Sequence, residues 1–394
     1  MKKFNIPEKY KSNVISNLKA KRKLDDPRKR DFSPAEVTFG NVTFYIARHF
    51  GFCYGVENAI EIAYNTIENN KDKRIFLLSE MIHNPIVNED LLTRGVKFLM
   101  DTKGNRLIDF NELTSDDIVI IPAFGTTVEI ENELKHKGID SYKYNTTCPF
   151  VEKVWNRAEA IGKNNTIIIH GKYLHEETRA TFSHTLQNSH AVIVKNLEEA
   201  KELGEIILTE NQILFEEKFK GKYSSGFDVK RDLISIGVVN QTTMLATETE
   251  QIAEYFKQIM ITKFGIENIT NHFADTRDTL CYATNDNQIS AKMLLETNAD
   301  IAIVVGGYNS SNTSHLVELL ENSFPTYYIS SDKCLISENE ISHYNYHDKT
   351  ELLTTKYLPK KSNIKIALTS GASCPDSIVE AVIEKLIKFG EKNN

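Results

Sequence analysis

Apolar and polar positions along the chain repeat one unit three times. Short apolar runs, typical of buried strands, are followed by segments with helical periodicity almost throughout, which predicts parallel α/β layers. Each unit begins with a cysteine directly before an amphipathic helix, in the segments FCYGVENAIEIAYNT, TCPFVEKVWNRAEAI and LCYATNDNQISAKML. The pattern therefore predicts that Cys53, Cys148 and Cys281 are equivalent residues.

Two further elements follow each cysteine in the same order. The first is an apolar strand, a polar turn and a helix start, whose polar residue lies 30, 27 or 29 residues after the cysteine at His83, His175 or Ser310. The second is a strand that ends in small polar residues, in DIVIIPAFGTTVE, ISIGVVNQTTMLA and IKIALTSGASCPD. Three elements in one order are stronger evidence than any one of them. They predict that Thr126, Thr242 and Ser373 are also equivalent.

The repeat predicts three related α/β domains at 41–147, 148–277 and 278–394, after an extension over residues 1–40. Polar stretches near 204–231 and 330–361 read as insertions in the second and third units. The functional edge of a parallel sheet is where the strands end. Three domains packed as a pseudo-threefold trefoil with these edges inward would bring the three cysteines together around a central site.

A thiol at a helix N-terminus is favoured as the thiolate, which is the form that binds metals. Three such thiolates suit a zinc site or an iron-sulfur cluster. Structural zinc usually takes a close pair of cysteines, and the sequence has no C-x2-4-C pair. A 4Fe-4S cluster held by three cysteines leaves one iron without a protein ligand, which favours catalysis over simple electron transfer. The alternative, that all three are ordinary buried cysteines, does not explain their equivalent placement.

Composition narrows the class of protein further. The net charge of −7 argues against a general nucleic-acid surface, and no apolar run approaches the roughly 20 residues that span a bilayer. The five cysteines are odd in number and scattered, which favours a reducing, cytoplasmic location over a disulfide framework. Cys334 and Cys374 have no counterparts in the other units and read as ordinary cysteines. Neither a secretory signal nor an acid-poor transit peptide fits the first forty residues.

Seven motifs of the chain resemble those of a known family. The motifs GFCYGVENAI, IHNPIVN, TTCPFVEKVW, IIHGKYLHEET, NQTTML, VVGGYNSSNTSHL and TSGASCPD resemble those of the hydroxymethylbutenyl diphosphate reductases. That resemblance extends over residues 42–388. It implies a reductive dehydroxylation of (E)-4-hydroxy-3-methylbut-2-enyl diphosphate to isopentenyl diphosphate and dimethylallyl diphosphate, the last step of the methylerythritol phosphate pathway. It also implies one 4Fe-4S cluster per chain, held by Cys53, Cys148 and Cys281.

The same resemblance assigns the other site residues. Glu177 and Thr242 would serve the hydroxyl end of the substrate and deliver a proton, although Glu176 stands beside Glu177 and the residues alone do not choose between the two acids. The diphosphate would be bound by His83, His175, Ser310, Ser311, Asn312 and Ser373. Hydroxyls, amides and backbone N–H groups at helix starts suit an anion, although the same residues are equally good helix caps.

One position departs from the pattern. Many bacterial members have a histidine where this chain has Phe124, and the form with Phe resembles the plant and cyanobacterial branch. We expect Thr126 or Thr127 to take over part of the missing histidine's role.

The chain has no G-x-G-x-x-G motif after a strand, which indicates that electrons come from a separate ferredoxin or flavodoxin. Two alternatives remain open at this stage. Quinolinate synthase and the radical enzyme of diphthamide synthesis share the three-domain, three-cysteine architecture, and a non-enzymatic redox sensor could carry such a cluster too.

Overall fold

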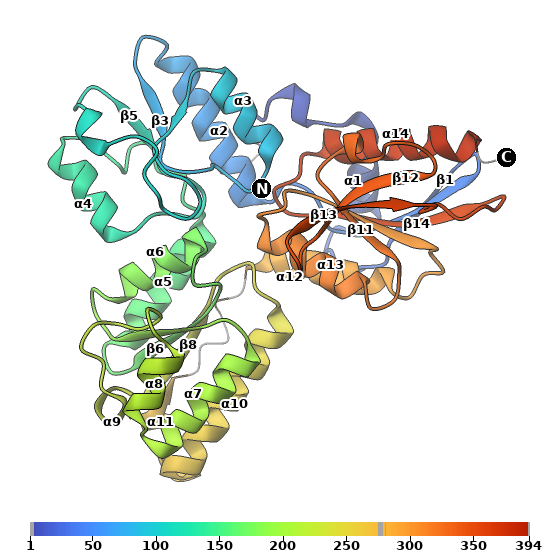
Figure 1. Ribbon diagram of the computed structural model, residues 1–394. Helices are drawn as coiled ribbons and strands as arrows, with labels where there is room; N and C mark the ends of the chain where they lie inside the picture. The colour runs from blue at the N-terminus through green and yellow to red at the C-terminus, as the bar shows by residue number, and fades with distance from the viewer. Residues whose placement is uncertain (1–3, 275–278, 280, 393–394) are drawn as a thin grey trace. The chain divides into compact units, whose positions relative to one another are not determined.

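The computed structural model describes residues 4–274, 279 and 281–392, which form two compact units (Figure 1). Unit 1 comprises Met1–Glu61, Ile82–Asp90 and Tyr282–Asn394, and unit 2 comprises Ile62–Met81 and Leu91–Cys281. The chain passes between them within helices α2 (Tyr54–Asn69) and α3 (Pro85–Thr93). The boundary expected between residues 277 and 278 lies outside the described residues. Both units are built of sheets and helices, so the α/β class is confirmed.

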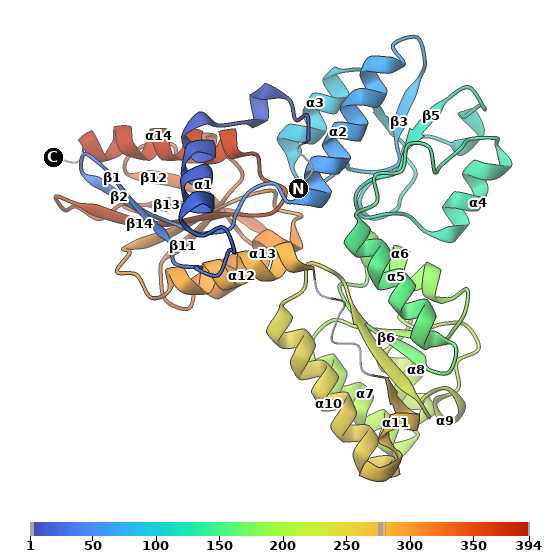
Figure 2. The same ribbon diagram turned by 180° about the vertical axis from the view of Figure 1, so that it is seen from behind.

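Unit 1 contains a five-stranded sheet in the order β1-β2-β14-β10-β11. Its strands are β1 (Ala35–Phe39), β2 (Val42–Ile46), β10 (Ile301–Val305), β11 (Thr326–Ile329) and β14 (Ile364–Ser370). All neighbours pair in parallel except β1 and β2, which form an antiparallel hairpin. Figures 1 and 2 show helices on both faces of this sheet. These are α1 (Asn13–Asp25) and α14 (Asp376–Lys392) on one face and α12 (Tyr282–Leu294) and α13 (Ser311–Leu320) on the other.

The two faces of this sheet are filled by alternate residues of the same strands. In β10, Ile303 and Val305 pack in the core formed with α14, whereas Ala302 and Val304 pack with Leu316 of α13. This is the period-two pattern of a strand, read out on two apolar faces. It explains why the central strands are nearly continuous apolar runs.

Strands β1 and β2 and helix α1, which come from residues 4–46, contribute to this sheet and its core. The domain bounds expected from sequence, with an extension over residues 1–40, stay a prediction. Strand β2 pairs with β14, with Val42 opposite Ile364. Helix α1 buries Ile15 completely in the same core. The short helix η1 (Glu8–Tyr10) precedes α1. Strand β2 thus supplies a parallel neighbour for β14 on the edge opposite β10.

Unit 2 contains two parallel sheets. The first, in the order β4-β3-β5, is formed by β3 (Ile75–Leu77), β4 (Lys97–Phe98) and β5 (Ile118–Ile120). The second, in the order β7-β6-β8-β9, is formed by β6 (Thr166–His170), β7 (Ala191–Val194), β8 (Ile236–Asn240) and β9 (Phe273–Ala274). With the sheet of unit 1, the described residues thus contain three parallel or mostly parallel sheets, as the repeat predicted.

Helices cover the second sheet of unit 2 on both faces. Val154 of α5 (Pro149–Gly162) packs on Ile167 and Ile169, near Phe182 of α6 (Glu176–Thr185). Residues of α7 (Leu197–Thr209) and α10 (Ala246–Phe264) pack on the opposite face with Ile168. Unit 2 also contains η2 (Phe110–Glu112), α4 (Val128–His136), η3 (Ile266–Asn268) and α11 (Ile269–His272). In this arrangement the N-termini of α5 and α6 lie at the C-terminal ends of strands.

The two expected insertions have regular structure. The second is a hairpin of β12 (Glu340–Asn345) and β13 (Thr350–Thr355), preceded by η4 (Asp332–Cys334). The first contains α8 (Gln212–Lys218) and α9 (Val229–Asp232). It begins later than expected, because α7 continues to Thr209 and buries Leu203 and Ile206 in the core.

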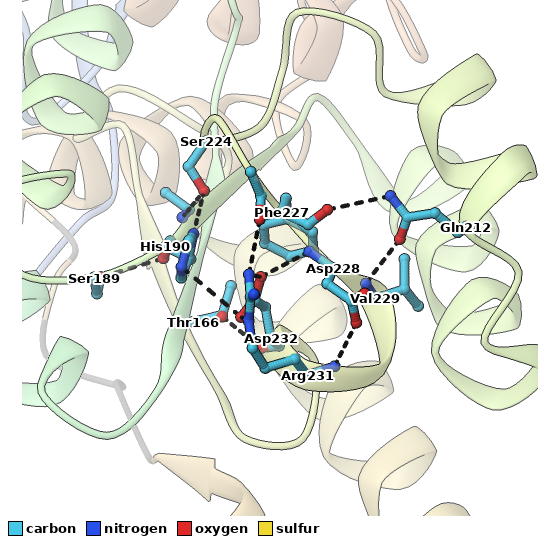
Figure 3. A network of polar contacts seen from close by, with 12 residues as sticks. Thr166, Ser189, His190, Gln212, Ser224, Phe227, Asp228, Val229, Arg231 and Asp232 are labelled. Carbon is cyan, nitrogen blue, oxygen red and sulfur yellow. Dashed lines mark hydrogen bonds and ion pairs between the residues drawn. The ribbon is translucent and has the colours of Figure 1, made fainter.

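Asp232 fastens the end of the first insertion to the sheet (Figure 3). Its carboxylate accepts hydrogen bonds from Nε of Arg231 at 2.7 Å and from the N–H of Asp228 at 2.8 Å. Its carbonyl accepts from Oγ1 of Thr166, the first residue of β6. Burial alone would raise the pKa of Asp232, but these bonds outweigh it and the pKa is lowered. The carboxylate of Asp232 therefore orders the end of the insertion, and its backbone carbonyl joins that end to β6.

Among the described residues, no helix has the length and apolar character that crossing a membrane would require.

Candidate active site

Each of the three predicted cysteines directly precedes a helix at the end of a strand. Cys53 precedes α2 and its N–H donates to the carbonyl of Ala372, just after β14, at 3.2 Å. Cys148 is the N-cap of α5 and its N–H donates to the carbonyl of Ala123, just after β5, at 2.9 Å. Cys281 precedes α12. Two residues earlier, the hydroxyl of Thr279 donates to Oδ1 of Asn240 at the end of β8, at 2.6 Å.

These positions fit an iron-sulfur group. Thiolates are its usual protein ligands, and a helix N-terminus favours the thiolate. All five cysteines of the chain are thiols rather than disulfides. Cys374 provides the contrast: it is completely buried in the apolar core of unit 1, and burial followed by the nearby Asp376 raises the pKa of its thiol. The chemistry of the site thus favours Cys53, Cys148 and Cys281 as ligands.

Glu177 and Thr242 form a two-point contact in unit 2. Oε1 of Glu177 accepts the N–H of Thr242 at 2.5 Å, and Oε2 accepts the Thr242 hydroxyl at 3.0 Å. The carboxylate comes from the first turn of α6 and is 1% exposed. Of the two neighbouring acids, Glu177 is therefore the one that faces Thr242. Glu176 instead lines a small cavity of about 60 Å³ with Thr126 and Thr127.

Gln241 fastens this pair in place, a role that the sequence analysis missed. Its Oε1 accepts the N–H of Lys172 at 3.1 Å and the hydroxyl of Thr178 at 3.0 Å. Its Nε2 donates to the hydroxyl of Thr243 at 2.6 Å. The side chain is completely buried, so leaving these groups unpaired would be costly. The available signal was a glutamine inside the NQTT motif, between a strand and a helix.

His175 is the N-cap of α6, and its ring has a defined orientation. Nδ1 accepts the N–H of Glu177 at 3.2 Å, so a neutral ring carries its proton on Nε2 and offers a donor there. The Phe124 and His175 rings pack edge to face, with their centroids 5.6 Å apart. Phe124, the position at which the sequence departs from the resemblance, thus lies against His175. The part expected of Thr126 or Thr127 stays a prediction.

In unit 1, the start of α13 offers a set of neutral donors. Ser310 is the N-cap and accepts the N–H of Thr313 at 3.2 Å. Oδ1 of Asn312 accepts the N–H of Ala372 at 3.0 Å. Nδ2 of Asn312 is buried and makes no hydrogen bond to any described residue. Ser311 is buried beside them. An amide held by its oxygen with its N–H2 group unused suits an anion.

His83 and Ser373 lie against the same turn of unit 1. The hydroxyl of Ser373 donates to the carbonyl of His83 at 3.0 Å. Gly307, three residues before Ser310, has no room for a Cβ because the His83 carbonyl occupies that space. His83 itself precedes the cap of α3, which is Asn84. Hydrogen bonds and packing therefore connect the predicted ligands of unit 1 with each other and, through Ala372, with Cys53.

The predicted residues thus form two groups, each within its own unit. Unit 1 has a cysteine and neutral donors at helix starts, without a carboxylate among the predicted residues. Unit 2 has two cysteines, a histidine donor and a carboxylate bound to a hydroxyl. The first set suits the binding of a phosphate group, and the second suits the delivery of a proton.

Comparison with known proteins gives consistent results. A family model described as LytB protein matches residues 44–387. The 4-hydroxy-3-methylbut-2-enyl diphosphate reductase of Picosynechococcus is 44% identical over 360 residues, covering 91% of this chain and 86% of the relative. That of Prochlorococcus marinus subsp. pastoris is 40% identical over 386 residues, covering 97% and 92%.

Solved structures agree with this result. One, of an (E)-4-hydroxy-3-methyl-but-2-enyl diphosphate reductase described as the terminal enzyme of the non-mevalonate pathway, is 25% identical with a TM-score of 0.51. It covers 87% of this chain and 98% of the solved one. The Plasmodium falciparum reductase, at 23% identity and a TM-score of 0.61, covers 86% of both chains and supports the fold.

Proposed function

The chain belongs to the LytB protein family, and we propose that it reduces (E)-4-hydroxy-3-methylbut-2-enyl diphosphate to isopentenyl diphosphate and dimethylallyl diphosphate. This is the last step of the methylerythritol phosphate route to isoprenoids. The observation that carries the proposal is the two-point contact of Glu177 with Thr242, because loss of a hydroxyl as water needs a positioned proton source. A redox sensor would have no use for such a pair.

Cys53, Cys148 and Cys281 would hold one 4Fe-4S cluster per chain. We propose that they belong to three related α/β domains, at 41–147, 148–277 and 278–394, arranged as a pseudo-threefold trefoil. When bound, the cluster supplies electrons and a Lewis-acidic iron. Each cysteine lies next to a helix start, which supports this assignment.

The diphosphate would be bound by the residues that the family resemblance assigns to it. Nδ2 of Asn312 is a buried donor that an anion can accept from, and a neutral His175 ring carries its proton on Nε2. The first turn of α13 adds its backbone N–H groups and its partial positive charge. The full set is His83, His175, Ser310, Ser311, Asn312 and Ser373. Bound at this end, the substrate would have only its hydroxyl end left to align.

Glu177 would act as the acid and Thr242 as the relay. A protonated Glu177 passes its proton to the Thr242 hydroxyl, which in turn donates to the substrate hydroxyl, so that the oxygen leaves as water. Two electrons enter and a second proton adds at either end of the allyl unit, giving the two products. We propose the substrate's own diphosphate as the source of that second proton.

The electrons would come from a separate ferredoxin or flavodoxin. The net charge of −7 supports a protein without a nucleic-acid surface, and the reduced cysteines support a cytoplasmic location. No membrane partner is proposed.

Anaerobic reconstitution with iron and sulfide, followed by an assay with the substrate and a chemical reductant, tests the proposal. We expect both isomeric diphosphates to form with one water released per substrate. A well-formed cluster, seen by its absorption and spin-resonance spectra, without any such turnover would overturn the enzymatic function and favour the sensor.

A further inference from the structure

Positive charge is concentrated at the start of the chain. Residues 1–30 contain eleven of the 47 Lys and Arg residues and three of the 54 Asp and Glu residues. The segment therefore carries a charge of +8 within a chain whose net charge is −7. This segment includes α1, which packs on the core of unit 1 through Ile15. The described residues 4–30 contain nine of these Lys and Arg residues and all three of the acids, so most of this charge lies on a structured part of the chain.

A cavity of about 280 Å³ in unit 1 lies against this basic segment. Its lining includes four cations: Lys19, Lys23, Lys29 and Arg48. Cys53, one of the three proposed cluster ligands, lines the same cavity. The positive surface and a proposed ligand of the redox group therefore share one opening.

Two of these cations are held by the protein itself. Nζ of Lys19 lies 2.7 Å from Oδ1 of Asp376. The guanidinium of Arg48 donates to the carbonyls of Arg22 at 3.1 Å and of Asp31 at 3.3 Å. By contrast, the side chains of Lys23 and Lys29 are exposed and form no hydrogen bond or ion pair with the described residues. These two lysines are available to a partner.

The cavity also contains acids and rings. Glu57 and Asp286 line it, and burial raises the pKa of each carboxyl. Its rings include Phe50 and Phe52. Burial, then the charge of Arg48 and Lys29, lowers the pKa of His49 to about 4, so its ring is neutral at pH 7. The cavity thus combines aromatic rings, which are enriched at protein interfaces, with exposed cations that can attract an acidic partner.

We propose that this basic face, defined by Lys19, Lys23, Lys29 and Arg48 around Cys53, is the docking site of the protein that supplies the electrons. The partner would be a small, acidic one-electron carrier. This inference rests on the proposed function, since a reductive dehydroxylation consumes two electrons per substrate. A carrier that delivers one electron at a time must bind and leave twice in each cycle. A weak encounter guided by opposite charge suits that requirement, because it speeds association without tight binding.

A small anion could also be drawn to these lysines. The charge, however, extends over thirty residues and lies beside aromatic rings, which fits a protein surface better than a single phosphate. The two readings differ in which kinetic constant depends on the lysines.

The test uses the full-length reconstituted protein and a reduced plant-type ferredoxin of net negative charge. The double variant Lys23→Glu/Lys29→Glu reverses the two available charges. Lys220→Glu/Lys257→Glu is the matched control, because both lysines are exposed in unit 2 and do not line the cavity. Turnover is measured with the ferredoxin and, separately, with reduced methyl viologen, and ferredoxin binding is followed by calorimetry without substrate.

For the cavity variant we expect the ferredoxin KM and Kd to rise about tenfold or more at low salt. The difference should shrink as salt is added, because exposed charges are screened. Turnover with methyl viologen should stay within about twofold of the parent, and the control should behave as the parent does.

Three results would overturn the docking site. They are an unchanged ferredoxin Kd, an equal loss in the control, and a rise in substrate KM with methyl viologen, which would assign the lysines to a small anion. Failure of the proposed function itself looks different, since the parent protein would then not turn over with methyl viologen at all.

Discussion

Helices α6 of unit 2 and α13 of unit 1 begin in the same way and end up with opposite chemistry. In each, a strand is followed by a glycine, Gly171 or Gly306, and the helix cap lies four residues later. The side chain of the second helical residue then reaches the end of a strand that neighbours the first one in the sheet, β8 in unit 2 and β14 in unit 1. There Glu177 accepts the N–H of Thr242, and Asn312 accepts the N–H of Ala372.

The shared hydrogen bond keeps the backbone alike while the side chains differ. Unit 2 places a carboxylate against a hydroxyl, and unit 1 places an amide against a methyl group. A carboxylate in the first turn of a helix occupies the positive end that an anion would otherwise use. The repeat thus provides one helix start for protons and leaves another open for phosphate. A single residue in the first turn of each helix thus determines whether that helix start serves a proton or a phosphate.

Glu177→Gln should have the largest effect, because it makes the acid of unit 2 an amide like that of unit 1. The glutamine keeps an oxygen that accepts the Thr242 N–H, but its amide has no acidic proton to transfer to the Thr242 hydroxyl. We expect kcat to fall by roughly a hundredfold to a thousandfold with little change in substrate binding. Steady-state kinetics and a direct binding measurement check this. Glu176→Gln is the matched control, and a kcat as low in the control would remove the special role of Glu177.

Asn312→Asp makes the opposite change and puts a carboxylate at the start of α13. Oδ1 can still accept the Ala372 N–H, but the donor is lost and a negative charge is added next to the diphosphate. We expect substrate KM and Kd to rise roughly thirtyfold, or about 2 kcal/mol. Asn322→Asp makes the same change at an exposed position just after α13. Unaltered binding in Asn312→Asp would mean that the diphosphate lies elsewhere.

Thr242→Ala should have the smallest effect, since it gives unit 2 the residue that unit 1 has at this point. The Glu177 carboxylate keeps the backbone N–H but loses the hydroxyl, so we expect kcat to fall roughly tenfold and unfolding stability by about 1 kcal/mol. Thr242→Ser should restore most of the rate. If serine does not, the hydroxyl is not the relay. The pH–rate profile of each variant completes the measurement.

The sequence predicted a repeated order of cysteine, strand and helix start but not the register of the repeat. Cysteine spacing identified the repeat because each cysteine sits in one recognisable place, at a helix start. The pairing of Thr242 with Ser373 was wrong by one residue, since hydrogen bonds make Thr242 equivalent to Ala372. Thr242 and Ser373 were matched because both carry a hydroxyl. The equivalent positions are instead those whose backbone N–H donates to the helix side chain. Similarly, His83 precedes its helix cap, whereas His175 and Ser310 are caps.

The local pattern of apolar residues also could not predict which strands pair when they are far apart in the sequence. The partner of β2 is β14, far along the chain, and nothing in the alternation of VTFYI says which strand it joins. Helix α1 gave little signal because only Ile15 is fully buried while Val14 and Leu24 are exposed. The expected extension was therefore read from charge, which describes the surface of α1 but not its packing.

The pairing of β2 with β14 also sets an order of events during synthesis. Thr43 and Asn363, whose side chains bond at 3.1 Å, are 320 residues apart. At a typical 5–20 residues per second, the ribosome needs about 16–64 s to produce the second after the first. Unit 2 lies wholly between them and can fold in that interval. The segment that contains β2 and Cys53 is therefore made long before β14 and lacks its partner strand until residues 364–370 have been made.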